Sequence, residues 1–206
     1  MVVAIDGPAG AGKSTVARAL AERLGARYLD SGAMYRSVAL LALRDPGAEP
    51  AALASGAAID LAPDGRVLLD GEDVTKAIRE PEVSGRASVI AAEPAVRAVL
   101  VEKQRGLLRD GDWVAEGRDI GTVVAPDATL KVYLDADPLE RARRRAEETG
   151  AAESGVLAEL RARDERDRGR AASPLREADG AVRVDTTGMS VGEVVDRIAG
   201  LARHPG

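Results

Sequence analysis

The 206-residue chain contains no cysteine, no phenylalanine and no asparagine, and aromatic residues make up only 2% of it. Without cysteine the protein can form neither a disulfide framework nor a thiolate metal site, as is typical of a reducing compartment. No apolar run approaches the roughly 20 residues that a membrane span needs. The N-terminal residues form a strand pattern and not a charged and then apolar targeting peptide. We therefore expect a cytoplasmic protein with no membrane partner.

An excess of positive charge is also missing, because the formal net charge is −5. The chain lacks the global basic field that holds nucleic acid, so we expect no nucleic-acid partner. Hydrophobic residues make up 45% of the sequence, which suffices for one good core and a small inserted subdomain. There is no internal repeat and no low-complexity linker, so we expect a single domain over residues 1–206.

A phosphate-binding pattern opens the chain. The apolar run over residues 1–6 predicts a buried strand, and apolar residues at helical spacing continue from Ser14 to a glycine cap at Gly25. Between them lies the pattern G-x-x-x-x-G-K-S, which ends at Ser14. The alternative is an ordinary glycine turn that caps a helix, but the flanking strand and helix favour a phosphate loop. We expect a nucleoside triphosphate to contact the whole loop: Gly7, Pro8, Ala9, Gly10, Ala11, Gly12, Lys13, Ser14 and Thr15.

The physical reason lies in the residue types. Glycines let successive backbone N–H groups face one phosphate, and the helix N-terminus adds partial positive charge. Lys13 can then reach the β- and γ-phosphates, and the Ser14 hydroxyl can ligate Mg²⁺.

Strands and helices alternate along the rest of the chain, which predicts a parallel sheet wrapped by helices. Two Asp-Gly turns within residues 58–75 predict a small antiparallel meander inserted at one edge. Ser190 and Glu193 form a capping box for the last helix. The further expected strands are residues 26–30, 112–117, 129–136 and 181–187, and the expected helices are residues 34–43, a pair over about 83–107, 138–148, 154–168 and 190–201.

Charged residues follow two of these strands at the edge of the sheet where the phosphate loop lies. Arg36 comes after the second strand, and Arg118 follows Glu116 at the end of the third. A guanidinium group grips a phosphate with two parallel hydrogen bonds, so the two arginines indicate a site for an anionic acceptor. Either arginine alone would be read as a solvated surface charge.

A third charged cluster, RARDERDRGR over residues 161–170, has two readings. Its interleaved Asp and Arg fit a salt-bridged surface helix, and they fit equally a mobile flap that brings arginines over developing negative charge. A nucleic-acid patch is a poor alternative, because no aromatic residue interleaves with the charges.

Several of these strings together resemble bacterial cytidylate kinase: IDGPAGAGKST, LDSGAMYR, EGRDIGTVVAPDA, KVYLDA and RDERDRGRAASPL. They occur in order over nearly the whole chain. The resemblance implies an α/β P-loop nucleoside-monophosphate kinase fold in three layers. A five-stranded parallel sheet would have helices on both faces, with a small antiparallel insert and a short lid. The core would be residues 1–35, 97–140 and 171–206, the monophosphate-binding insert residues 36–96, and the lid region residues 141–170.

The resemblance also implies ATP as donor with Mg²⁺, and CMP or dCMP as acceptor. Position by position, the acceptor phosphate would meet Ser31, Arg36 and Arg118, the cytosine would meet Ser88, Arg97 and Asp119, and the ribose would meet Tyr35, Arg163 and Asp167, with Arg170 closing on the phosphates. The implied catalytic residues are Lys13, Arg118, Arg163 and Arg170. Glu116 stands where Asp is expected in many members of the family, and its contact is left open.

An anionic phosphate oxygen as acceptor needs no general base, so we expect no role for the sole histidine, His204. We also expect the protein to be a monomer. Trp113 is expected in the core. The Arg141–Arg145 run fits either Glu140–Arg144 pairing on a solvated helix or a donor-phosphate contact. A regulatory GTPase is nearly excluded, because without asparagine there is no Asn-Lys-x-Asp motif to read guanine. The remaining rivals are a small P-loop kinase of another acceptor (UMP, shikimate, a sugar acid or dephospho-coenzyme A) and a non-enzymatic nucleotide-binding module.

Overall fold

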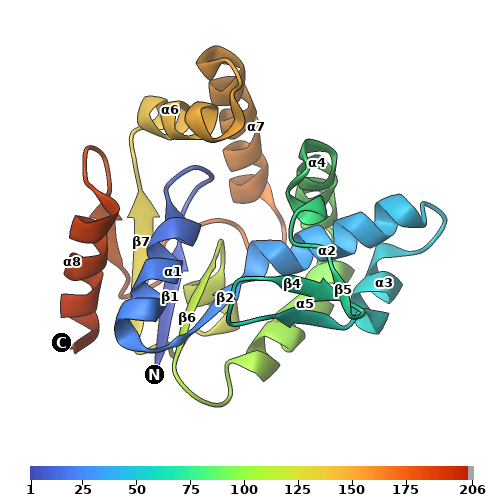
Figure 1. The fold of residues 1–206 in the computed structure, drawn as a ribbon, viewed down its shortest axis with the longest axis horizontal. Coiled ribbons are helices and arrows are strands. Elements are labelled where there is room, and N and C mark those ends of the chain that lie inside the picture. The colour runs from blue at the N-terminus through green and yellow to red at the C-terminus, as the bar shows by residue number, and fades with distance from the viewer. Residues whose placement is uncertain (204–206) are drawn as a thin grey trace.

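A five-stranded parallel sheet forms the centre of the computed structural model, which describes residues 1–203 (Figure 1). The strands lie in the order β2-β6-β1-β7-β8, and every neighbouring pair is parallel. Their bounds are β1 Val2–Asp6, β2 Arg27–Asp30, β6 Trp113–Gly117, β7 Leu130–Asp135 and β8 Val182–Asp185. The predicted fold class is therefore confirmed.

Alternate residues of the central strands feed two separate cores. Val3, Ile5 and Val114 pack with α1 (Lys13–Leu24) and α8 (Val191–Arg203) on one face. Ala4 and Trp113 pack on the other face with α5 (Pro94–Leu107) and a π-helical turn over Ile120–Val124, which the sequence did not predict. The sheet is thus covered on both faces, and Trp113 lies in the core as expected.

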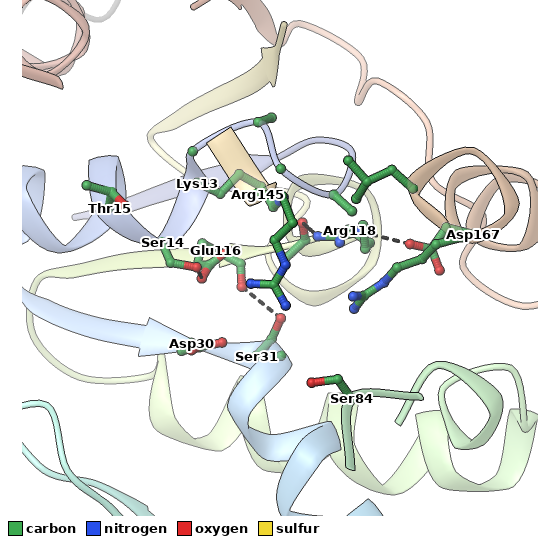
Figure 2. Close-up of a pocket in the computed structure, with 18 of the residues that line it drawn as sticks. Lys13, Ser14, Thr15, Asp30, Ser31, Ser84, Glu116, Arg118, Arg145 and Asp167 are labelled. Carbon is green, nitrogen blue, oxygen red and sulfur yellow. Dashed lines mark hydrogen bonds and ion pairs between the residues drawn. The ribbon is translucent and has the colours of Figure 1, made fainter. Parts of the chain in front are cut away.

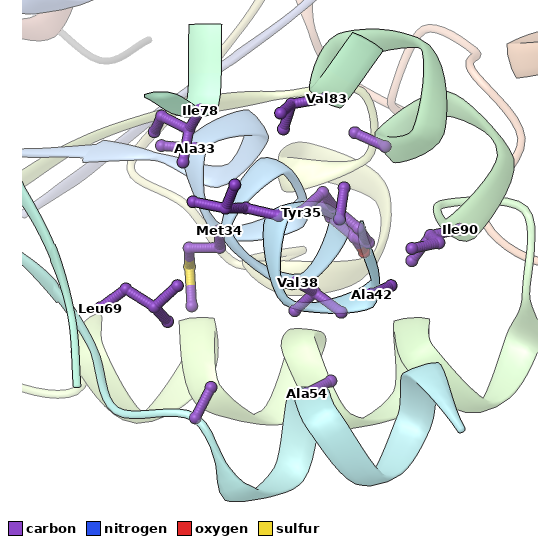
Figure 3. Close-up of a cluster of buried hydrophobic side chains, with 14 of the residues drawn as sticks. Ala33, Met34, Tyr35, Val38, Ala42, Ala54, Leu69, Ile78, Val83 and Ile90 are labelled. Carbon is purple, nitrogen blue, oxygen red and sulfur yellow. The ribbon is translucent and has the colours of Figure 1, made fainter. Parts of the chain in front are cut away.

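The segment after β2 forms a further cluster of buried apolar side chains beside the main sheet (Figure 3). It contains α2 (Ser31–Arg44), α3 (Pro50–Gly56), a 3₁₀ turn (Ala77–Arg79), α4 (Pro81–Ile90) and the predicted meander, with β3 Ile59–Leu61, β4 Val67–Leu69 and β5 Glu72–Asp73. The sequence missed α3, which is short and has one fully buried residue, Ala54. It also placed the start of α2 three residues late, because the Asp30 side chain caps this helix by accepting the backbone N–H of Ala33.

Two helices form a hairpin over the phosphate loop: α6 (Pro138–Thr149) and α7 (Glu153–Gly169). Both fall where the charged helices were predicted. The capping box before α8 is also confirmed, since the Ser190 N–H donates to the Glu193 carboxylate at 2.8 Å. His204 lies outside the described residues.

Within residues 1–203, no helix combines the length and apolar character needed to cross a membrane. The division into a core, an insert of residues 36–96 and a lid of residues 141–170 stays a prediction.

Candidate active site

A cleft of about 820 Å³ lies at the carboxyl ends of β2 and β6, next to the phosphate loop (Figure 2). The loop and α1 form one wall, α4 and α7 close it from two sides, and the residues just after β2 and β6 form the floor. A parallel sheet directs ligands to this edge because the loops that follow its strands converge there. The cleft therefore brings together segments that are far apart in the sequence.

The phosphate loop takes a backbone shape that only glycine readily adopts at three points. Gly10 and Gly12 have φ of 76° and 84°, and Gly12 leads directly into α1. A Cβ at Gly7 would lie 2.0 Å from the carbonyl oxygen of Leu134, so a side chain there would collide with β7. Gly7 and Pro8 do not line the cleft, unlike the other seven predicted loop residues.

Lys13 is the buried cation of this loop. Its ammonium group donates to the Pro8 carbonyl at 2.7 Å. Burial and the nearby Arg118 together lower the pKa of Lys13 to about 7, against the opposing effect of Glu116. A polyanion beside this lysine would favour its charged form, because an opposite charge offsets the cost of burial.

Ser14 and Glu116 provide the oxygen atoms that fit a magnesium ion. The Ser14 hydroxyl donates to Oε1 of the Glu116 carboxylate at 2.5 Å, and both residues line the cleft beside the loop. Burial raises the pKa of Glu116, and Asp30 on the neighbouring strand raises it further. Hydroxyl and carboxylate oxygens are hard ligands of the kind Mg²⁺ prefers, and a cation here would relieve the cost of two nearby carboxylates. Sequence reasoning left the contact of Glu116 open.

Several arginines line the cleft next to the phosphate loop and Glu116. Arg36 pairs with Asp30 at 2.9 Å, and Arg118 donates to Asp167 at 2.9 Å. Burial lowers the pKa of Arg163 to about 10, and its neighbour Arg118 adds to this shift. An anion would relieve the mutual repulsion among these half-buried cations, so the arrangement suits a phosphate.

A second pair of buried charges lies deeper in the cleft. Arg97 and Asp119 are each 3% exposed, and the Arg97 guanidinium donates to the Asp119 carboxylate. The Arg97 side chain also lies 5.3 Å from the ring centroid of Tyr35, whose hydroxyl is buried without a hydrogen bond among the described residues. Burial raises the pKa of Tyr35 to about 12, so its hydroxyl stays protonated. These groups form a polar surface with fixed donors and acceptors.

Asp119 is held in position by Asp6, a residue that the sequence analysis did not identify. The buried Asp6 carboxylate at the end of β1 accepts the N–H of Ile120 at 2.8 Å and that of Gly121 at 2.7 Å. These are the two residues after Asp119, so Asp6 holds the start of the π-helical turn. Burial raises the pKa of Asp6 to about 6, against the opposing effect of the Gly121 hydrogen bond.

Helix α7 is attached to the rest of the molecule at three places. Asp164 accepts from Arg141 at 2.6 Å and from the backbone N–H of Ala9 in the phosphate loop at 3.2 Å. Asp167 holds Arg118, and Arg166 donates to the Ser88 hydroxyl in α4 at 2.6 Å. The hypothesis of a purely solvated surface helix is therefore wrong for the C-terminal half of α7. Its movement as a flap stays a prediction.

The Arg141–Arg145 run divides between structural and cleft-lining roles. Arg141 is 5% exposed and also donates to the Ala9 carbonyl at 3.0 Å, so it ties α6 to the loop. Arg144 pairs with Glu140, as predicted for a solvated helix. It also donates to Thr186 and lines the cleft. Arg145 lines the cleft as well. Arg143 pairs with the half-buried Glu140 and the exposed Glu147 on its own helix.

The cleft brings together every residue predicted for the acceptor. They are Ser31, Tyr35, Arg36, Ser88, Arg97, Arg118, Asp119, Arg163, Asp167 and Arg170. The Ser31 hydroxyl donates to the backbone carbonyl of Glu116 at 2.7 Å, which joins the ends of β2 and β6. Arg166 was missed, and its only signal in the sequence was its place within the charged cluster.

Comparison with known proteins points to one family. Residues 3–204 match the family model described as cytidylate kinase. The chain is 51% identical to a cytidylate kinase of Solibacter usitatus over 98% of its own length and 92% of that relative. It is also 51% identical to a bifunctional pantoate ligase/cytidylate kinase of a Synechococcus strain, over 98% of this chain but only 44% of that longer protein.

Solved structures agree on the fold. An uncharacterized protein from Eubacterium ventriosum superposes with a TM-score of 0.61 at 13% identity, with 99% of each chain covered. A shikimate kinase from Bacteroides thetaiotaomicron gives a TM-score of 0.53 at 13% identity, with 98% of each chain covered. At these identities the likeness shows the fold alone.

Proposed function

Because this chain belongs to the cytidylate kinase family, we propose that it transfers the γ-phosphoryl group of ATP to the phosphate of CMP or dCMP. The observation that carries the proposal is a single cleft with a phosphate loop at one end and the buried Arg97–Asp119 pair at the other. The cluster of arginines lies between them. This order of charges matches that of a donor triphosphate facing a nucleoside monophosphate.

On the donor side, the loop amides and Lys13 would hold the β- and γ-phosphates, and Ser14 with Glu116 would hold Mg²⁺. When bound, Mg²⁺ neutralises charge on the phosphate oxygens. With a pKa of about 7, Lys13 is partly neutral at neutral pH, and a bound triphosphate would favour its charged form.

On the acceptor side, Tyr35, Arg163 and Asp167 would meet the ribose. Ser31, Arg36 and Arg118 would orient the monophosphate so that one of its oxygens faces the γ-phosphorus. That oxygen is already anionic, so no general base is needed, and catalysis reduces to positioning and charge stabilisation. Arg170 would add to the stabilisation, because one of its guanidinium nitrogens is buried without a partner among residues 1–203.

Base recognition would rest on complementary hydrogen bonds. Asp119 can accept from the amino group of cytosine, and Arg97 can donate to N3 and O2. Two features favour these roles: both side chains are buried, and the Nε of Arg97 has no hydrogen-bond partner in the described part of the chain. Uracil would place a carbonyl against Asp119 and an N–H against Arg97, which leaves buried charges mispaired.

We also propose a monomer that works in the cytoplasm. The monomer is supported by the cleft itself, since a single chain supplies the residues for both nucleotides. Sedimentation velocity with and without CMP would test the oligomeric state, and a dimer in both conditions would contradict it.

The decisive experiment is an ADP-release assay with a panel of acceptors: CMP, dCMP, UMP, AMP, shikimate, a sugar acid and dephospho-coenzyme A. We expect turnover with CMP and dCMP, and loss of turnover by orders of magnitude in a folded Lys13→Ala variant. Preferred turnover of shikimate, a sugar acid or dephospho-coenzyme A would make the protein a kinase of another acceptor. Failure with every acceptor would favour a nucleotide-binding module.

A further inference from the structure

The hydroxyl of Tyr28 contacts the proposed metal site without lining the cleft. Tyr28 is in β2, next to β6, and its hydroxyl donates to Oε1 of Glu116 at 3.1 Å. The same oxygen accepts from the Ser14 hydroxyl at 2.5 Å. Ser14 and Glu116 line the cleft, whereas Tyr28 does not. Any effect of this hydroxyl on a ligand in the cleft therefore passes through Glu116.

Glu116 needs such a contact because its side chain has rotatable bonds that its backbone does not control. The backbone is held on both sides, since β6 pairs with β2 at Asp30 and with β1 at Ile5. The carboxylate is held by two donors on Oε1, while Oε2 accepts no hydrogen bond within residues 1–203. One oxygen is thus fixed and the other is left for a ligand in the cleft. Groups that orient metal-binding side chains in this way contribute to metal affinity.

Tyr28 is itself well held as a donor. The guanidinium of Arg18 lies 5.3 Å from its ring centroid, and Arg18 is one turn along α1 from Ser14. The phenol and the serine hydroxyl therefore approach Glu116 from two different elements, β2 and α1.

We propose that Tyr28 is a positioning residue for the divalent cation that accompanies the nucleotide. Its hydroxyl holds Glu116 so that the free carboxylate oxygen and the Ser14 hydroxyl serve the same ion. The inference rests on the proposed function, because it requires a nucleotide-bound cation at Ser14.

The test is the affinity for Mn²⁺, measured by electron paramagnetic resonance in the presence of a non-hydrolysable ATP analogue. Tyr28→Phe removes the hydroxyl and keeps the ring. We expect the Mn²⁺ affinity of the complex to fall about three- to tenfold, below the 10- to 100-fold typical of groups that contact a metal ligand directly at established sites. The affinity for the analogue without metal should not change.

Tyr133→Phe is the matched control. Tyr133 lies in β7, also carries an arginine over its ring, at 5.5 Å, and makes no hydrogen bond through its hydroxyl within the described residues. Its loss should leave Mn²⁺ affinity within about 1.5-fold of the wild type.

A double-mutant cycle separates positioning from a general structural effect. In a Glu116→Asp background the shorter carboxylate no longer reaches the phenol, so adding Tyr28→Phe should have no further effect on Mn²⁺ affinity. Equal effects of Tyr28→Phe in both backgrounds, or an unchanged affinity in the single variant, would overturn the inference while leaving the proposed function intact. A wild-type protein that binds no Mn²⁺ with the nucleotide would overturn both.

Discussion

At the scale of single residues, the base-reading end of the cleft depends on two buried charges of opposite sign. Arg97 also donates to the Ala91 carbonyl at 3.0 Å, and Asp119 is placed by the turn that Asp6 holds. A buried charge whose partner is removed or mismatched costs free energy, because water cannot reach it. Turnover should therefore depend on the hydrogen-bond donors and acceptors of the base, and not on its size alone.

We predict that the native protein prefers CMP and dCMP to UMP, and that it excludes AMP by size. Each mismatch should cost about 1–3 kcal/mol, or roughly ten- to hundredfold in kcat/KM. The measurement is the ratio of kcat/KM for CMP and UMP in the native protein and in Asp119→Ala and Arg97→Ala. A native protein without preference, or a ratio that survives both substitutions, would show that other residues read the base.

Asp6 gives a pH prediction at the same scale. Its pKa rises from 3.8 to about 6 on folding, so the folded state holds this proton more tightly than the unfolded chain. The resulting stability is present below pH 3.8 and is lost as the pH rises through 6. Relative to Asp6→Asn, which does not titrate, the wild type should lose about 2 kcal/mol of unfolding free energy between pH 4 and pH 7.

Urea unfolding of both proteins across this range measures the difference. Asp127→Asn is the control, because Asp127 is exposed and makes no hydrogen bond or ion pair among residues 1–203. A constant gap between wild type and Asp6→Asn at all pH values would contradict the prediction.

At the scale of elements, α7 joins three parts of the fold. Asp164 connects it to the phosphate loop, Asp167 to the end of β6 and Arg166 to α4. Ala9 packs in an apolar cluster with residues of both α6 and α7, which adds to the attachment of the hairpin. The phosphate loop is therefore in direct contact with the helix that lines the acceptor site, so a nucleotide bound at the loop can affect that helix.

We predict that Arg166→Ala weakens CMP binding three- to tenfold, because the Ser88 hydroxyl loses the donor that orients it. Calorimetric titration with CMP would measure the change. Arg168→Ala is the matched control, because this exposed residue of the same helix turn makes no hydrogen bond or ion pair among the described residues. Equal affinities in the two variants would mean that the α4–α7 contact plays no part in binding.

We also predict that the segment 163–170 closes on the nucleotides. Arg170→Ala should lower turnover, because Arg170 lines the cleft with a buried nitrogen free to donate. CMP together with an ATP analogue should protect the segment from proteolysis in the native protein. Unchanged turnover and an unchanged digestion pattern would together argue for a static helix.

At the scale of the whole molecule, the sign of the charge in the cleft is opposite to that of the chain. The net charge is −5, yet cations outnumber carboxylates among the side chains that line the cleft. Low-dielectric walls focus such a field, so a negatively charged nucleotide is attracted to the cleft by a protein of the same sign.

Salt should therefore weaken CMP binding. Between 0.02 and 0.5 M KCl the Debye length falls from about 20 Å to about 4 Å, and we expect CMP affinity to fall by roughly an order of magnitude. Cytidine lacks the phosphate, so its weaker binding should change little over the same range. An equal response of CMP and cytidine would show that the field of the cleft does not act on the phosphate.

The sequence by itself determined the features that depend on neighbouring residues. The phosphate loop, the alternation of strands and helices, the turns of the meander and the last helix cap are all encoded within a few positions, and each was predicted correctly. The arginines after β2 and β6 were also found, because parallel strands bring their carboxyl ends to one edge. The short helix α3 and the π-helical turn were missed, since neither has a strong local pattern.

Only the tertiary structure decided which polar groups meet. Tyr28 and Glu116 are 88 residues apart, Arg166 and Ser88 are 78 apart, and Asp6 and Gly121 are 115 apart. These partners are chosen by strand register and by the packing of α7 against α4, which no local pattern in the sequence records. The physical reason is burial: once water is excluded, each polar group must find a partner in the fold, and that partner can lie anywhere along the chain.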